Sequence, residues 1–416
     1  MHELFLLGQE RSDEAEEIRD SSEGPWRELP KEQRHLLHGL SKDLNDIKHV
    51  TSVDTGGEVS PIFVQALNAS YTGNYAEALD ILRAHKTIPP FSRISFMRGR
   101  NWEEMGEAKT ALLFFDHAAR LAPENEEYQA AALGAFCEAH PDNGKIKIEK
   151  ILDDPQSYPA AVIVRACEIR FQETLELGDE RRNLTIYKQI VHALHIAIMW
   201  MQKGPRQKLI SEAQPIYSVV CSLLATCCRN LGMIDPAFHY YTTAIGLDPL
   251  NPPLLIARGA VLYGQSGFVT EFAIQDFMRA IRIGTDIGIP YYFLAHYYLL
   301  TGQYKRTLQA VVEGLGKEGG KRLKSEMMEY RAIALAALSF NTHATTEAFQ
   351  EALKIDETNY RAKTNLEVYE NTLKEKLTTP IEQRWLLKID PIWLARELPR
   401  PLTLQESYDA HWRMAG

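Results

Sequence analysis

Apolar side chains in the middle of the chain recur every three or four residues, and short polar turns separate the runs. This spacing places the apolar side chains on one face of a helix. The runs come in pairs, with a glycine at the turn inside many pairs and a proline after the second run of several. Proline cannot continue a helix, and glycine is common where one ends. The pattern therefore predicts an all-α protein built from consecutive helix pairs.

Two stretches, 92–125 and 218–251, follow the same plan at the same spacings. Each has a small residue in the first helix, a glycine turn, two alanines on either side of an aromatic residue in the second helix, and a closing proline. Small residues let two helices approach closely, and the aromatic side chain fills the gap beside them. In order, these positions are Gly99, Gly106, Ala111, Phe115, Ala118 and Pro123, and then Ala225, Gly232, Ala237, Tyr241, Ala244 and Pro249.

This pattern resembles the tetratricopeptide repeat (TPR). The resemblance implies an α-solenoid, a superhelix of about seven to eight TPR-like helix pairs over residues 58–376. Residues 156–216 match the repeat pattern least well, so we expect an irregular, enlarged unit there. The helix expected from Tyr360 to Lys376 would cap the end of the stack. Outside the solenoid we expect an N-terminal extension (residues 1–57), which is acidic and partly mobile before a short helix, and a tryptophan- and proline-rich tail (residues 377–416).

The charge balance and the length of the apolar runs limit the kinds of partner. The net charge is −9, whereas nucleic-acid binding needs a cationic surface, so we expect no nucleic acid as a partner. The apolar run from Ile190 to Met201 is about half the length of a membrane helix, so no membrane span is predicted. The first residues lack the basic lead of a secretory signal, and a cytoplasmic location is therefore the default expectation.

No motif in the sequence indicates catalysis, a cofactor or a metal. The five cysteines include no Cys-x-x-Cys pair, and as isolated thiols in apolar helices they predict core packing. The histidine pairs His35/His38 and His192/His195 lie one helical turn apart, but no third ligand accompanies either pair. The glycines of residues 316–320 lack the Gly-Lys-Ser/Thr ending of a phosphate loop. We therefore predict that the chain is not an enzyme.

The TPR resemblance implies that the first helix of each pair lines the concave face of the solenoid. The repeat register then places two arginines and a phenylalanine on the inner face of an early unit, and mostly aromatic residues on that of the later units. The Lys/Asn set with which some TPR proteins bind a C-terminal carboxylate is missing. The candidate partner-binding residues are Arg93, Phe96, Arg100, Tyr263, Tyr292, Phe293, His296 and Tyr330.

The tail carries three of the six tryptophans of the chain. So many apolar side chains need a cover, which is either the solenoid of the same chain or a partner protein. We expect Trp385 and Trp393 to anchor the tail on the C-terminal repeats. A tail that also lies over Tyr292 and Tyr330 would compete with an external ligand.

The sequence therefore predicts an interaction scaffold or adaptor that binds a peptide or a helical segment of another protein. One alternative is an accessory subunit that presents substrate proteins to a separate catalytic subunit, such as a modifying transferase. A further alternative is an enzyme whose site lies unrecognised in residues 156–216 or in the tail.

Overall fold

The computed structural model describes residues 12–49, 61–84, 91–176, 180–203, 214–266, 270–339, 342–375, 385–389 and 397–415. In these residues the chain forms twenty α-helices, one 3-10 helix and a single isolated β-bridge. Most consecutive helices pack against one another in pairs, as the repeat pattern predicts. The protein divides into two compact units, and each unit is a helical-repeat stack of this kind.

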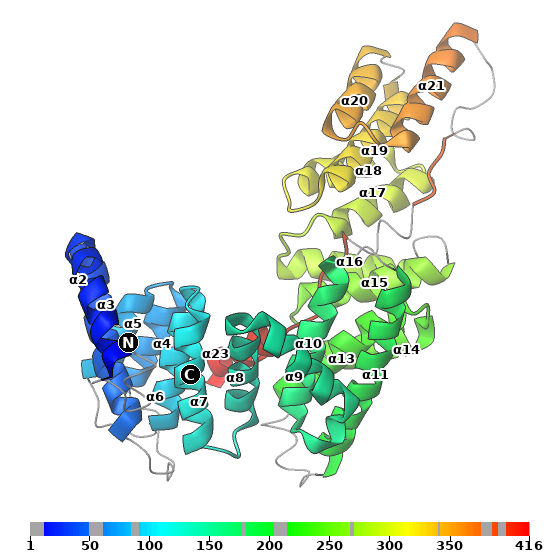
Figure 1. Ribbon diagram of the computed structural model, residues 1–416. Coiled ribbons are helices and arrows are strands. Elements are labelled where there is room, and N and C mark those ends of the chain that lie inside the picture. Colours follow the sequence, from blue (N-terminus) through cyan, green and yellow to red (C-terminus); the bar gives the residue numbers. More distant parts are fainter. Residues whose placement is uncertain are drawn as a thin grey trace. The chain divides into compact units, whose positions relative to one another are not determined.

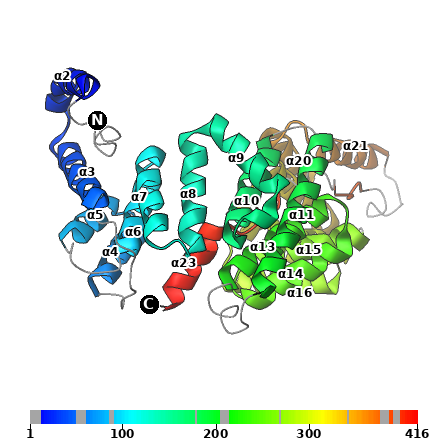
Figure 2. The same ribbon diagram turned by 60° about the horizontal axis from the view of Figure 1, so that its bottom comes forward.

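Unit 1 comprises residues Met1–Gly178, His192–Arg206 and Tyr408–Gly416. Its helices α4 to α8 lie side by side (Figure 2). The bounds of its elements are α2 (Asp13–Glu28), α3 (Lys31–His49), α4 (Pro61–Tyr71), α5 (Tyr75–Ala84), α6 (Phe91–Glu104), α7 (Ala108–Leu121), α8 (Glu126–Ala139), α9 (Pro141–Asp153), η1 (Pro155–Ser157) and α10 (Ala160–Glu176).

Unit 2 comprises residues Asp179–Val191 and Gln207–Ser407. Its pairs stack from α13 to α20, and α21 follows at the end (Figure 1). Two helices, α11 (Glu180–Lys203) and α23 (Leu404–Ala415), have residues in both units. The other helices are α13 (Gln214–Asn230), α14 (Ile234–Leu247), α15 (Pro252–Ser266), α16 (Glu271–Ile283), α17 (Ile289–Leu300), α18 (Tyr304–Leu315), α19 (Lys321–Ser339), α20 (Thr342–Ile355) and α21 (Tyr360–Glu375).

The same turn recurs inside four of the helix pairs. Its glycines, Gly73, Gly106, Gly232 and Gly302, have φ angles of 80°, 81°, 75° and 71°. Only glycine adopts this left-handed conformation without strain, because any Cβ atom would crowd the following carbonyl group. Backbone geometry therefore explains the glycine turns predicted at Gly106 and Gly232, and Gly73 and Gly302 adopt the same conformation.

Small residues lie where the two helices of a pair cross. A Cβ atom on Gly99 would come within 2.7 Å of the Phe115 ring, and one on Gly259 within 2.7 Å of the Phe277 ring. Ala118 is completely buried, as is its counterpart in the second full repeat. Each aromatic ring thus fills the space that the missing side chain leaves, which is the packing that the repeat pattern predicts.

Two regions differ from the simple repeat. Residues 13–28, assigned to an acidic extension in the sequence, form helix α2. Three of the four boundaries between the two units fall within residues 156–216, the stretch predicted to be irregular, and the fourth lies between Ser407 and Tyr408. Here α10 and α11 are 17 and 24 residues long, and both exceed the 14 residues of α6 or α7. Among the described helices, none is both long enough and apolar enough to cross a membrane.

Candidate functional site

A short extended segment of the tail, residues 385–389, lies against the helices of unit 2, and we call it the strap. Its side chains alternate between buried and exposed. Ile389 is only 2% exposed, and Trp385 and Leu387 are half-buried, whereas Leu386 is 44% exposed and Lys388 is exposed. Successive side chains of an extended chain point to opposite sides, so every second residue of the strap faces the helices.

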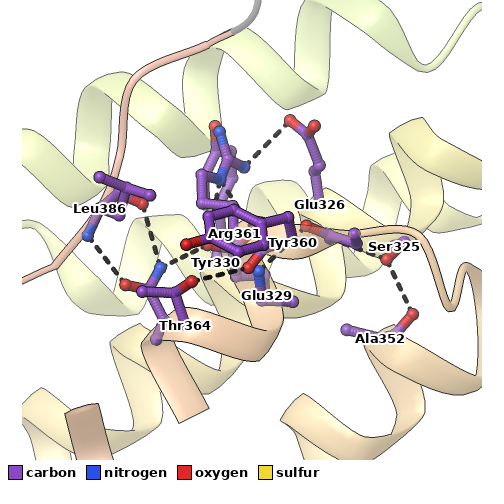
Figure 3. A network of polar contacts seen from close by, with 12 residues as sticks. Ser325, Glu326, Glu329, Tyr330, Ala352, Tyr360, Arg361, Thr364 and Leu386 are labelled. Carbon is purple, nitrogen blue, oxygen red and sulfur yellow. Dashed lines mark hydrogen bonds and ion pairs between the residues drawn. The ribbon is translucent and has the colours of Figure 1, made fainter. Parts of the chain in front are cut away.

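The side chains that hold the strap come mainly from α21. The Asn365 amide donates to the carbonyl oxygen of Leu386 at 3.0 Å, and the Leu386 N–H donates to the Asn365 side-chain oxygen at 2.8 Å. These two bonds are the dashed lines that end at Leu386 in Figure 3. Nη1 of Arg361 donates to the carbonyl oxygen of Lys388 at 3.3 Å. All three bonds go to the backbone of the strap, so they hold an extended chain whatever its side chains are.

Aromatic side chains contact the two ends of the strap. The ring centroid of Trp385 lies 6.1 Å from that of Phe349 on α20. At the other end, the Tyr263 hydroxyl on α15 is hydrogen-bonded to the backbone of Ile389. We call Tyr263, Phe349, Arg361 and Asn365 together the strap site. It combines aromatic side chains with a small number of fixed polar groups, as ligand-binding sites commonly do.

A buried network of charges orients the polar groups of the strap site. Nε of Arg361 donates to both carboxylate oxygens of Glu329, at 3.0 and 2.9 Å, and Nη2 lies 3.0 Å from Oε2 of Glu326. The Asn365 amide also donates to Oε1 of Glu329, at 2.6 Å. Nε of Arg322 lies 3.1 Å from Oε1 of Glu326, so two arginines face two glutamates. These contacts fix Asn365 and Arg361 in the positions from which they bind the strap backbone.

Burial changes the ionisation of groups in this network. It raises the pKa of Glu329 to about 7, although the Arg361 charge and hydrogen bonds favour the carboxylate. Burial, with a contribution from Arg361, lowers the pKa of His296 to about 3. Burial also raises the pKa of Tyr330 far above its usual value. His296 and Tyr330 are therefore neutral near pH 7, and their hydrogen bond of 3.1 Å links two uncharged side chains.

The five candidate residues of the later units come together, but they lie in the core. The ring of Tyr263 lies 5.3 Å from that of Phe293, and the Tyr292 ring lies 5.3 Å from that of Tyr330. With His296, these side chains are between 0% and 6% exposed. The first helices of neighbouring pairs pack against one another, so aromatic residues at this register fill the space between them. They do not form an open surface: Tyr263 contacts the strap itself, and Arg361 of the strap site lies over the Tyr330 ring at 5.1 Å.

The candidate residues of the early unit also have partners. Phe96 is buried, with its ring centroid 4.7 Å from that of Tyr128. Arg100 donates to both carboxylate oxygens of Asp409 in the part of α23 that belongs to unit 1, with 3.1 Å between Nη2 and Oδ2. Arg93 is half-buried, with its guanidinium carbon 5.7 Å from the centre of the Phe63 ring.

Sequence reasoning missed the residues that hold the strap. Arg361 and Asn365 lie one turn apart on α21, which the sequence identified only as a capping helix. The solvent-facing charges predicted for this helix include Glu367 and Glu370, and both are exposed. The opposite face could have indicated a polar site, because Arg361 and Asn365 share it at four-residue spacing. Of the two predicted tail anchors, Trp393 lies outside the described residues.

Comparisons with known proteins show only the architecture. No family model matches the sequence, and no curated protein matches it significantly. Among solved structures, a monomeric mutant of IFIT1 is 15% identical, covers 94% of this chain and 97% of that chain, and has a TM-score of 0.37. The human IFIT1 dimer is 14% identical, covers 96% and 100%, and has TM-scores of 0.37 with m7Gppp-AAAA and 0.40 with PPP-AAAA. At this level the likeness concerns the fold alone, and the chain is a helical-repeat α-solenoid with TPR-like repeats.

The structures named above correct one prediction. They contain IFIT1 with Gppp-AAAA, m7Gppp-AAAA or PPP-AAAA, which are ends of RNA. The prediction that excluded a nucleic-acid partner is therefore wrong. It relied on the net charge of −9, which is a sum over the whole chain, whereas binding depends on the local potential of one surface.

Proposed function

We propose that this chain is a protein-binding scaffold, and that the strap site of unit 2 binds an extended segment of a partner protein. The observation that supports the proposal is the strap itself, because the site already holds an extended peptide segment. The proposal assigns the chain a binding role without catalysis of its own.

The polar groups of the site suit this role because they recognise backbone. Asn365 contacts both the N–H and the carbonyl oxygen of Leu386, and Arg361 contacts the carbonyl oxygen of Lys388, two residues further along. Their side chains are also held by Glu329 and Glu326, through contacts that do not involve the strap. A site fixed in advance loses little conformational entropy on binding, so more of the contact energy contributes to affinity.

The strap then acts as an intramolecular competitor. A segment tethered to its own site has an effective concentration on the order of millimolar. A partner segment of similar sequence would bind the intact chain weakly until the strap leaves. Binding should therefore be measured with a chain in which the strap is weakened.

A labelled synthetic peptide with the sequence of residues 383–391 tests the proposal by fluorescence polarisation. The receptor is the full chain with Trp385→Ala and Ile389→Asp, which we call the released chain. Its circular dichroism should match that of the unmodified chain. We expect the released chain to bind the peptide at least about tenfold more tightly than the unmodified chain does, because the competitor is weakened. Adding Asn365→Ala to the released chain should abolish this gain.

Two results would overturn the proposal. One is a released chain that keeps its helical content and does not bind the peptide. The other is binding of PPP-AAAA that the peptide displaces, because it would assign the same site to nucleic acid. An oligonucleotide that the peptide cannot displace would bind elsewhere and would leave the peptide site supported.

A further inference from the structure

From the strap we infer which partner segments the site selects, an inference that rests on the proposed function. The strap site takes an internal, extended segment with a large aromatic residue followed by aliphatic residues two and four positions later. The two positions between these three residues accept any side chain, except that the first of them must have a backbone N–H and so cannot be proline. In the strap, the residues at these three positions are Trp385, Leu387 and Ile389.

The burial pattern supports the three selected positions. Ile389 is 2% exposed and belongs to the main apolar core of unit 2, against which Trp385 and Leu387 also pack. Trp385 adds a ring contact with Phe349. Apolar contact area at a few central positions supplies most of the affinity in interfaces of this kind. Residues at the two outward positions contact no comparable surface, since Leu386 and Lys388 are exposed.

The backbone contacts add a restriction that does not depend on side chains. The N–H of Leu386 donates to Asn365, so a partner with proline at that position would lose the donor. The four prolines of the tail, at positions 380, 391, 399 and 401, all lie outside residues 385–389. The chain continues on both sides of the strap, so the site does not require a free terminus.

The charges of the site explain why a terminal carboxylate or a phosphate is a poor ligand. Arg361 already pairs with Glu326 and Glu329, and Arg322 also faces Glu326. An anion at an inward position would have to separate these buried pairs, and that costs more than an exposed ion pair gains. The site therefore favours uncharged, apolar side chains at its inward positions.

A series of labelled peptides, measured on the released chain, tests this selection rule. The inward changes Trp385→Ala, Leu387→Ser and Ile389→Ser should each weaken binding about tenfold or more, because they remove buried area. The outward changes Leu386→Ser and Lys388→Ser should change it less than about threefold. A peptide in which Lys388 and Ile389 exchange places is the matched control, since its composition is unchanged, and it should bind as weakly as the inward variants.

The backbone requirement has its own probes. A peptide N-methylated at Leu386, or one with Leu386→Pro, keeps the inward side chains but lacks the donor, and both should lose binding. Similar losses at inward and outward positions, with normal binding of the unmodified peptide, would overturn the selection rule and leave the proposed function standing. If the unmodified peptide also fails to bind, the proposed function fails with it.

Discussion

Replacing Asn365 with alanine removes both hydrogen bonds that hold the backbone of Leu386. Those bonds measure 3.0 and 2.8 Å, and Asn365 is completely buried. The carboxylate of Glu329 loses one donor but keeps Arg361. We therefore expect the helices of unit 2 to remain folded while the strap detaches more often.

The size of the effect follows from the number of bonds lost. One intramolecular hydrogen bond contributes about 0.5 to 1.5 kcal/mol net, so two contribute about 2 kcal/mol. A change of about 2 kcal/mol raises the detached population roughly 30-fold. The estimate concerns the opening of the strap only, because the remaining contacts of Trp385 and Ile389 are unchanged.

Hydrogen exchange measured residue by residue gives this opening equilibrium directly. The amide of Leu386 should exchange about 30-fold faster in the Asn365→Ala chain. The control is Asn371→Ala, which makes the same chemical change at an exposed position of the same helix. If Leu386 exchanges at the same rate in both variants, Asn365 does not hold the strap and the reasoning is refuted.

Three further predictions concern packing and acid stability. Ala118→Leu and Ala244→Leu should each destabilise the fold by roughly 1–3 kcal/mol through overpacking, and unchanged melting temperatures would contradict the repeat register. Gly259→Ala should destabilise the fold by about 1–3 kcal/mol in urea unfolding, because the new methyl group meets an aromatic ring at 2.7 Å. Gly246→Ala on α14 places its methyl group in open space and should stabilise the fold by about 0.5–1 kcal/mol in the same assay. Burial lowers the pKa of His296 to about 3 in the folded chain, so the folded state favours the neutral imidazole. Its contribution to the free energy of unfolding is therefore complete above pH 6.5 and decreases as the pH falls, by about 2 kcal/mol at pH 5. Urea unfolding at pH 7 and pH 5 should show a smaller difference for His296→Gln, and an equal difference would contradict the assignment.

The helix pairs could be predicted because each one is encoded locally. Gly106 and Gly232 adopt a left-handed backbone at the turn, and Gly99 leaves room for an aromatic ring of the next helix. These residues recur at fixed spacings in the sequence, so the sequence alone predicts the helix pairs. Helix α2 was missed because its sequence is largely polar, and such a stretch has little apolar periodicity to reveal a helix.

The candidate site was predicted less well because it depends on residues far apart in the chain. The repeat register placed Tyr263 and Tyr330 on one inner face, but register alone does not show how deeply a side chain is buried, and both side chains are buried. Arg361 meets Glu329 across 32 positions, and Asn365 meets Leu386 across 21. The four-residue spacing of Arg361 and Asn365 indicates a shared helix face, but no local spacing indicates the distant residues that this face contacts.

The pairing of the charges inside the network has a consequence for the behaviour of complexes in salt. Arg322 and Arg361 face Glu326 and Glu329, and the strap is held by neutral backbone groups and apolar contacts. Salt screens exposed charges and weakens contacts to phosphates steeply, but it leaves hydrogen bonds and apolar burial largely intact. A protein held by the strap site should therefore stay on an affinity column at an ionic strength that removes nucleic acids and loosely attracted acidic proteins.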